Sequence, residues 1–218
     1  MLNDHDFATS EKLLIKAKNL SAGTLIVYYN LAVLYSRAGE YDKAIEELNE
    51  AIKINPSEQL IIDALGWTYY WKNDFENAVK YFSKYPEIEA SFEDSTQTVP
   101  FRARLGMTYL KMGKKKEASV LFAEDKKIRL DLLSGKRSMG AWGNYGNLYY
   151  DLAVHEAYSG NDAKAVQYID SAFHYQFINL WLYKNDPMFS NLQSRDDFKR
   201  VIKKVEDFDQ FRKRSQRP

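Results

Sequence analysis

The sequence predicts an all-α solenoid of antiparallel helix pairs, and three observations support this fold class. First, a pattern of small and large residues returns after 34 positions, so that Ala32 is matched by Gly66. Second, helix breakers are scarce, with 5 Pro and 10 Gly among 218 residues, which favours long helices joined by short turns. Third, the last part of the chain carries apolar residues at helical spacing and can close an array of repeats. A period of this length is typical of helix-pair repeats, each of which contacts only its neighbours.

The clearest copy of the repeat covers residues 25–58. Two helical patterns, near Leu25–Ala38 and Tyr41–Ile54, flank Gly39, which can adopt the positive φ of a helix end at little cost. The second pattern ends at Pro56, because the residue before a proline avoids the α region. Small residues fall where helices must approach closely, and large residues fill the gaps between them. The matching positions are Tyr28, Leu31, Ala32, Tyr35, Ala44, Leu48, Ala51 and Pro56 in this copy, and Ile62, Leu65, Gly66, Tyr69, Ala78 and Phe82 in the next.

The rest of the chain is expected to continue the array as a single domain over residues 1–218. Further repeats are predicted at 59–92, 99–132 and 146–179. The third copy lies 40 residues after the second, and the fourth lies 47 residues after the third, instead of the regular 34. Loops are therefore expected near 92–98 and 134–146. Residues 5–20 match the second helix of a repeat and form either a half repeat or a cap helix. Residues 180–212 are expected to form a C-terminal cap.

These positions resemble the tetratricopeptide repeat (TPR) family, whose pattern is W-x2-L-G-x2-Y, followed by A-x3-F, A and P. In the first copy Tyr28 replaces Trp, Ala32 replaces Gly and Leu48 replaces Phe. The resemblance implies a right-handed superhelix of antiparallel helix pairs with a C-terminal capping helix. The string D-P-x-F-x-x-L-x5-F at 186–198 is similar to the closing segment of bacterial TPR proteins, some of which are attached to regulators, kinases or cyclases.

Composition and motifs exclude several classes of function. The net charge of +1 gives no strong field for nucleic acid, and acidic residues interleave with the basic stretches. The absence of Cys removes disulfides and thiolate sites, and neither a signal peptide nor a membrane-spanning stretch is recognisable. A cytoplasmic protein is the simplest interpretation. The zinc-protease, P-loop, dinucleotide and G-x-S-x-G motifs are all missing, so we expect no enzyme activity, no catalytic residue, no metal and no cofactor.

The family resemblance implies that the first helix of each repeat lines a groove for a partner. Trp67 and Trp71 are four residues apart and share a helix face, and Tyr70 borders them. Exposed aromatic side chains favour binding, although the partner that covers them can be another part of the same chain. The cations among the groove positions suit a peptide with acidic and apolar side chains or a C-terminal carboxylate. The expected partner-binding residues are Tyr29, Arg37, Trp67, Tyr70, Trp71, Arg104, Lys111, Tyr150 and Tyr158.

The sequence therefore predicts a non-catalytic scaffold that binds a peptide segment of a partner protein, without nucleic acid or membrane. One alternative is a regulatory or sensor module that acts with a transcriptional or signalling enzyme. Another is a groove that serves as a small-molecule or enzyme pocket. Pairing of end helices would also permit a homo-oligomer.

Overall fold

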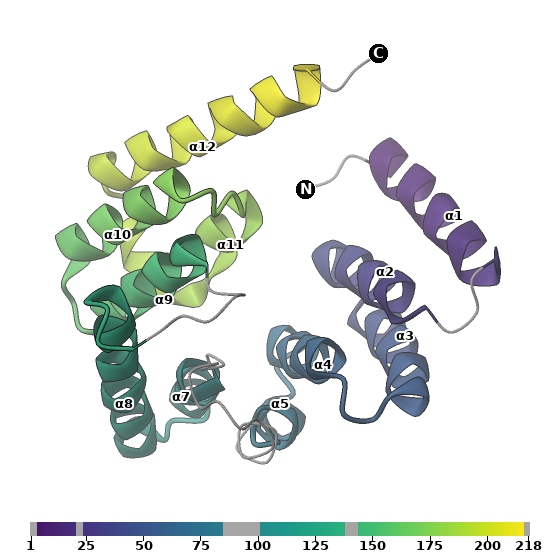
Figure 1. The fold of residues 1–218 in the computed structure, drawn as a ribbon, viewed down its shortest axis with the longest axis horizontal. Coiled ribbons are helices and arrows are strands. Elements are labelled where there is room, and N and C mark those ends of the chain that lie inside the picture. Colours follow the sequence, from purple (N-terminus) through teal and green to yellow (C-terminus); the bar gives the residue numbers. More distant parts are fainter. Residues whose placement is uncertain (1–3, 21–23, 85–100, 138–143, 216–218) are drawn as a thin grey trace. The chain divides into compact units, whose positions relative to one another are not determined.

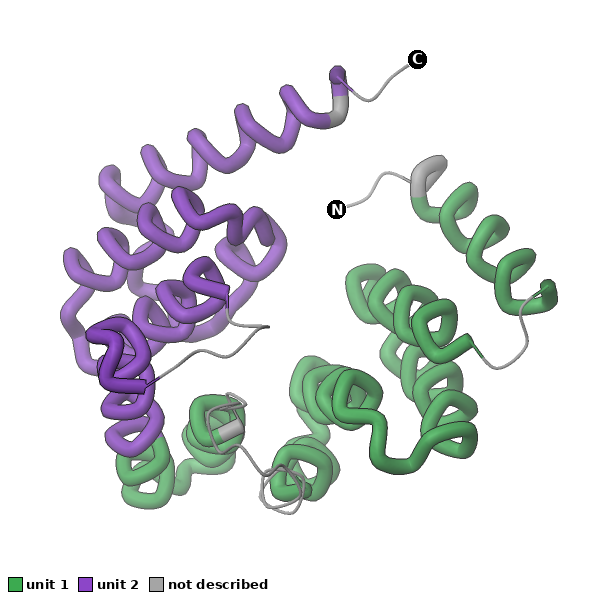
Figure 2. The backbone as a smooth tube through the Cα atoms, in the orientation of Figure 1, with its two compact units in different colours: residues 1–95, 101–121 green, residues 96–100, 122–218 purple. Residues whose placement is uncertain are grey.

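The computed structural model describes residues 4–20, 24–84, 101–137 and 144–215, and every regular element in these ranges is a helix (Figure 1). This confirms the all-α fold class. Among the described residues, two compact units can be distinguished (Figure 2): unit 1 holds those up to Leu121, and unit 2 those from Phe122 onward. The single domain expected over 1–218 stays a prediction. None of the helices in the described ranges is long and apolar enough to cross a membrane.

Unit 1 contains successive helix pairs preceded by one further helix. The helices expected at Leu25–Ala38 and Tyr41–Ile54 are confirmed with these bounds, and a helix also covers the predicted stretch 5–20. The region expected to loop near 92–98 lies outside the described residues. Within the described residues, the helices of unit 1 are α1 (Asp4–Leu20), α2 (Leu25–Ala38), α3 (Tyr41–Ile54), α4 (Gln59–Trp71), α5 (Phe75–Phe82), α7 (Phe101–Lys111) and the first part of α8 (Lys115–Leu133).

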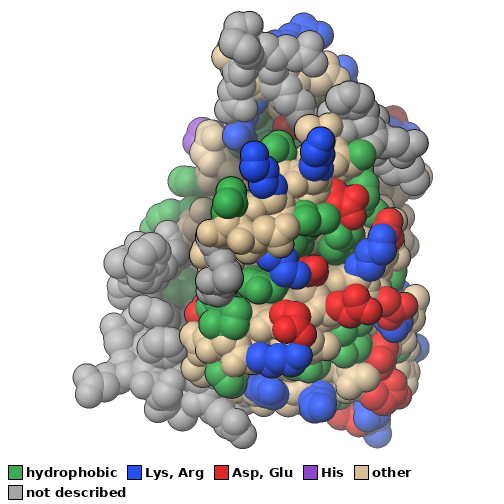
Figure 3. All heavy atoms as spheres, turned by 90° about the vertical axis from the view of Figure 1, so that its right-hand side faces the viewer, with side chains coloured by type: hydrophobic (Ala, Val, Ile, Leu, Met, Phe, Trp, Pro, Cys, Tyr) green, Lys and Arg blue, Asp and Glu red, His purple; other side chains and the backbone are tan. Residues whose placement is uncertain are grey.

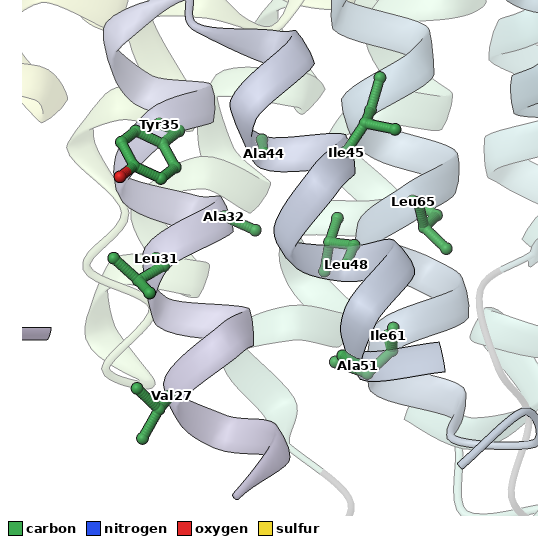
Figure 4. Packing of buried hydrophobic residues seen from close by; sticks show 10 residues of the cluster. All are labelled: Val27, Leu31, Ala32, Tyr35, Ala44, Ile45, Leu48, Ala51, Ile61 and Leu65. Atoms are coloured by element: carbon green, nitrogen blue, oxygen red, sulfur yellow. The ribbon is translucent and has the colours of Figure 1, made fainter. Parts of the chain in front are cut away.

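The core of unit 1 is built from the residues that define the sequence period (Figure 4). Leu31 of α2 and Leu48 of α3 are fully buried, and Leu65 of α4 extends the same cluster. Gly39 ends α2 with a φ of +83°, and its N–H donates to the carbonyl oxygen of Ser36. Helix α1 packs its Phe7 onto this cluster.

The first two repeats fill the same interface with different pairs of residues. In the first repeat, Ala32 of α2 and Leu48 of α3 belong to the same buried cluster. In the second repeat the corresponding residues are Gly66 and Phe82. A Cβ atom at Gly66 would lie only 2.4 Å from the Phe82 ring. The smaller residue on α4 therefore makes the room that the larger residue on α5 occupies.

Unit 2 consists of a helix pair with the C-terminal segment packed against it. Asn144 caps α9 because its side chain accepts the backbone N–H groups of Gly146 and Asn147. The C-terminal helix buries Phe198 and Val205, as expected for a capping helix. The elements of unit 2 are the remainder of α8, α9 (Tyr145–Tyr158), α10 (Asp162–His174), α11 (Leu180–Asn185), the 3-10 helix η1 (Pro187–Leu192) and α12 (Asp196–Ser215).

Charged side chains of both signs cover the outer surface, and many of them are paired. Lys18 of α1 binds Glu47 of α3 at 2.6 Å, and Lys72 binds Asp42 at 2.5 Å. On the face in Figure 3, acidic, basic and hydrophobic side chains are interspersed. This distribution agrees with the near-zero net charge of the sequence.

Candidate partner-binding surface

The first helices of three successive repeats stand next to one another in unit 1. Helices α2 and α4 are linked by a hydrogen bond of 3.3 Å between the Ser36 and Thr68 hydroxyls. Helices α4 and α7 are linked by an ion pair between Asp63 and Arg104. The repeat offsets then place equivalent residues in rows that run across the three helices. One row consists of Arg37, Trp71 and Lys111, and a second consists of Val33, Trp67 and Met107.

Arg104 is held in place by two neighbours on α4. Its guanidinium donates to the carboxylate of Asp63 and lies over the Trp67 ring, 5.6 Å from the ring centroid. Both side chains of the ion pair are about four-fifths buried, at 17% and 21% exposure. Burial raises the pKa of the nearby Tyr29 and Asp63 raises it further, whereas Arg37 and Arg104 lower it. Tyr29, Trp67 and Arg104 are thus brought together, and the charge of Arg104 is balanced within the surface itself.

The aromatic residues expected to share a face form one cluster, but they are not equally accessible. Trp67 stacks on Trp71 with ring centroids 6.0 Å apart, and both remain half-buried. Tyr70 packs edge-on against Trp71 at 5.3 Å and against Phe75 at 5.9 Å, and it is only 3% exposed. The expectation that Tyr70 faces a partner is therefore corrected: neighbouring aromatic rings cover it because its position on α4 turns toward the paired helix α5.

Arg37 and Lys111 supply the accessible positive charge of this surface. Each is exposed, and neither forms an ion pair with another residue in the described ranges. They occupy the two ends of the row whose middle position is Trp71. The repeat offsets therefore place Trp71 between two exposed cations, neither of which is ion-paired within the described residues of unit 1.

The two site residues expected in the fourth repeat belong to unit 2 and have different surroundings. Tyr150 is 9% exposed, and its ring lies among Phe177, Tyr183 and Phe189. Burial raises the pKa of Tyr150 well above its usual value, and Asp186, which accepts its hydroxyl, adds to the rise. The expected surface position of Tyr150 is therefore corrected, because the C-terminal segment packs over it.

Tyr158, the other site residue of the fourth repeat, is half-buried. Its ring contacts Phe122 with centroids 4.3 Å apart. Its proposed contact with a partner stays a prediction.

A buried ionic network between α8 and α9 escaped the sequence analysis. Asp125 accepts from Arg129 at 2.9 Å and lies 2.6 Å from Nε2 of His155, and Arg129 also pairs with Asp151 at 2.9 Å. Burial, the largest influence, would raise the pKa of Asp125, but Arg129 and His155 outweigh it and the pKa is lowered. The signal that could have revealed the network is the four-residue spacing of Asp125 with Arg129 and of Asp151 with His155, which puts each pair on one helix face.

Glu156 provides a second polar link in the same unit. Its carboxylate accepts from Asn161 at 2.7 Å and pairs with Lys126 of α8 at 3.0 Å. At the equivalent position the first three repeats carry Tyr35, Tyr69 and Tyr109. In the described ranges, no group of three His, Asp or Glu side chains is arranged to hold a metal ion.

Comparison with known proteins identifies the repeat. A family model described as "Tetratricopeptide repeat" matches residues 26–58. The chain contains a tetratricopeptide repeat. The match coincides with α2 and α3 and with the turn after them. As a family, TPR repeats are protein-interaction modules, so a protein-interaction scaffold is the class of function that this match supports.

Solved structures with the TPR fold resemble the chain over most of its length. PilF of Pseudomonas aeruginosa has 16% identity and a TM-score of 0.51, with 92% of this chain and 83% of that chain covered. A putative kinesin light chain of Podosopora anserina with nearly identical TPR-like repeats has 18% identity and a TM-score of 0.50, with 79% and 88% covered. At this identity the likeness concerns the fold. No curated protein matches the sequence significantly.

Proposed function

We propose that the chain is a non-catalytic scaffold and that the face of α2, α4 and α7 binds an extended segment of a partner protein. The observation that carries this proposal is the row formed by Arg37, Trp71 and Lys111, one residue from each of three successive first helices. A ligand that follows the row meets a cation, an indole and a second cation in turn.

The chemistry of the row favours a segment with acidic and apolar side chains. Carboxylates of the partner would pair with Arg37 and Lys111, and charge-assisted hydrogen bonds of this kind are the stronger ones. An apolar or aromatic partner residue would pack beside Trp71, because tryptophan offers a large contact area at small entropic cost. Arg104 contributes indirectly, because it is ion-paired with Asp63 and its guanidinium packs on the Trp67 ring.

The test is a selection of peptides from a random display library on the immobilised full chain. Enriched peptides should combine acidic and apolar residues. We expect the charge reversal R37E/K111E to lower the affinity for the enriched peptides at least about tenfold, or about 1.4 kcal/mol. Calorimetry measures this affinity. Both side chains are exposed, so helicity measured by circular dichroism should stay unchanged.

A matched control is the charge reversal K12E/K16E. Both lysines are exposed on α1, so the change in net charge is identical while the row is intact. Peptide binding should persist in this control. Equal weakening by both double variants would show that net charge alone, and not the row, governs binding.

The alternative of a regulatory module rests on the tail motif. The motif residues that unit 2 buries are Asp186, Phe189, Leu192 and Phe198. Their burial is what residues that close a repeat array require. An association with a transcriptional or signalling enzyme stays a prediction, as do the cytoplasmic location, the absence of nucleic-acid binding and a homo-oligomer.

A further inference from the structure

Four tyrosines form a continuous aromatic patch on unit 2 that the proposed function does not use. Tyr145 and Tyr149 come from α9, Tyr168 comes from α10, and Tyr175 directly follows α10. Tyr149 stacks on Tyr175 with centroids 5.3 Å apart and an interplanar angle of 19°. Tyr145 lies 5.3 Å from Tyr175, and Tyr149 lies 5.9 Å from Tyr168. We refer to these four residues as the tyrosine patch.

The patch is anchored at one side and open at the other. Tyr168 packs against the buried cluster of Leu132, Leu148 and Leu152, which fixes its ring. Tyr145 and Tyr175 are each 44% exposed, among the most exposed large aromatic residues in the described ranges. Aromatic side chains that remain this exposed while packed on a core cluster are typical of a binding surface.

The polar groups of the patch are its four phenolic hydroxyls. None of the four hydroxyls is hydrogen-bonded to another residue in the part of the chain that the structure describes. Lys164 lies 5.6 Å from the Tyr168 ring centroid, and the His174 ring lies edge-on to Tyr175 at 5.2 Å. Burial raises the pKa of Tyr149, and Tyr175, Tyr168 and Tyr145 follow as further causes, so the phenol keeps its proton at neutral pH.

We propose that the tyrosine patch binds a proline-rich protein segment in the polyproline II conformation. Such a segment has no internal hydrogen bonds, so its carbonyl oxygens are available to accept from the tyrosine hydroxyls. Its proline rings pack on aromatic faces, and its preformed helix loses little entropy on binding. A cationic ligand fits less well, because Lys164 already occupies one ring face. A single-stranded nucleic acid needs a row of cations along its backbone, whereas the patch has one lysine on its rings.

The test uses a fluorescein-labelled decaproline peptide and the full chain, with binding followed by fluorescence anisotropy. The variant Y145A/Y175A should lose at least about tenfold in affinity. The variant Y145F/Y175F keeps both rings and removes both hydroxyls, so it should lose affinity by a smaller factor. This second variant also keeps the proposal testable if the alanine variant fails to fold.

Two controls separate the patch from other surfaces. Phe211→Ala removes a 66% exposed aromatic ring from α12 of the same unit and should leave binding unchanged. R37E/K111E alters the surface of unit 1 and should also leave it unchanged. The proposal is overturned if decaproline does not bind, if it binds no better than a glycine-serine peptide of equal length, or if Y145A/Y175A binds as the wild type does. Tighter binding of a polylysine peptide or of an oligothymidine would overturn it in favour of those ligands.

Discussion

Units 1 and 2 hold neighbouring helices together by different interactions. In unit 1 the core within a repeat is apolar, with Gly66 packed against the Phe82 ring, and the ion pair between Asp63 and Arg104 keeps about one-fifth of each side chain exposed. In unit 2 the contact between α8 and α9 includes charged groups that are almost completely buried. Arg129 has a side-chain exposure of 7%, and its partner Asp125 has 4%.

The difference concerns how much each unit depends on a single residue. In an apolar interface, shortening one side chain costs stability that grows with the cavity left behind. A buried ionic network is different, because removal of one charge leaves its partner buried and uncompensated. The charge balance of the network is also tight, since Arg129 serves both Asp125 and Asp151. We therefore expect unit 2 to be the more vulnerable of the two to the loss of one ion.

The largest expected effect is that of Arg129→Met, which keeps an unbranched side chain and removes the charge. Asp125 and Asp151 would then lack their shared cation, and the free energy of unfolding should fall by about 3–5 kcal/mol. Urea denaturation followed by circular dichroism measures this loss. Arg104→Met is the comparison variant in unit 1, where about one-fifth of each side chain of the ion pair stays exposed, and its loss should be smaller than that of Arg129→Met. Equal losses in the two variants would remove the distinction between the units.

The sequence predicted the helices well wherever the 34-residue period is regular. The bounds of α2 and α3 follow from Gly39 and Pro56, because a positive φ and a proline act locally and can be read from single residues. Helix α1 covers the stretch 5–20, which was expected because it matches the second helix of a repeat. Local backbone preferences and periodic packing are thus sufficient for this part of the fold.

The accessibility of the site residues could not be predicted in the same way. Tyr70 and Tyr150 occupy positions that line a groove in the family pattern, yet both are buried. Tyr150 is covered because Asp186 accepts its hydroxyl and Phe189 packs on its ring, and these residues are 36 and 39 positions further along the chain. Such contacts depend on how the last segment folds back, which no repeat offset describes. The pairing of Asp125 with His155 is non-local for the same reason.

A second prediction concerns the apolar interface of unit 1. Gly66→Ala places a methyl group 2.4 Å from the Phe82 ring, so the ring must move, and overpacking of this kind costs about 1–3 kcal/mol. The double variant G66A/F82L reproduces the combination of Ala32 and Leu48 from the first repeat and should recover most of the loss. Thermal or urea denaturation of the single and double variants gives the coupling energy between the two sites. Strictly additive effects would mean that the side-chain sizes at positions 66 and 82 are not energetically coupled.

The smallest expected effect is the acid sensitivity of the ionic network in unit 2. The pKa of Asp125 in the folded chain is lowered, with burial opposing the shift and Arg129 and His155 causing it. A carboxylate of this kind stabilises the fold at pH values above its unfolded pKa of about 4, and the stabilisation is lost as the pH falls through the folded pKa. The free energy of unfolding should therefore fall below about pH 4. Asp125→Asn should be less stable than the wild type at pH 7 but should show a shallower fall in acid. Because all other carboxylates are shared by the two proteins, the difference between their pH curves reports on Asp125, and parallel curves would contradict its role in the network.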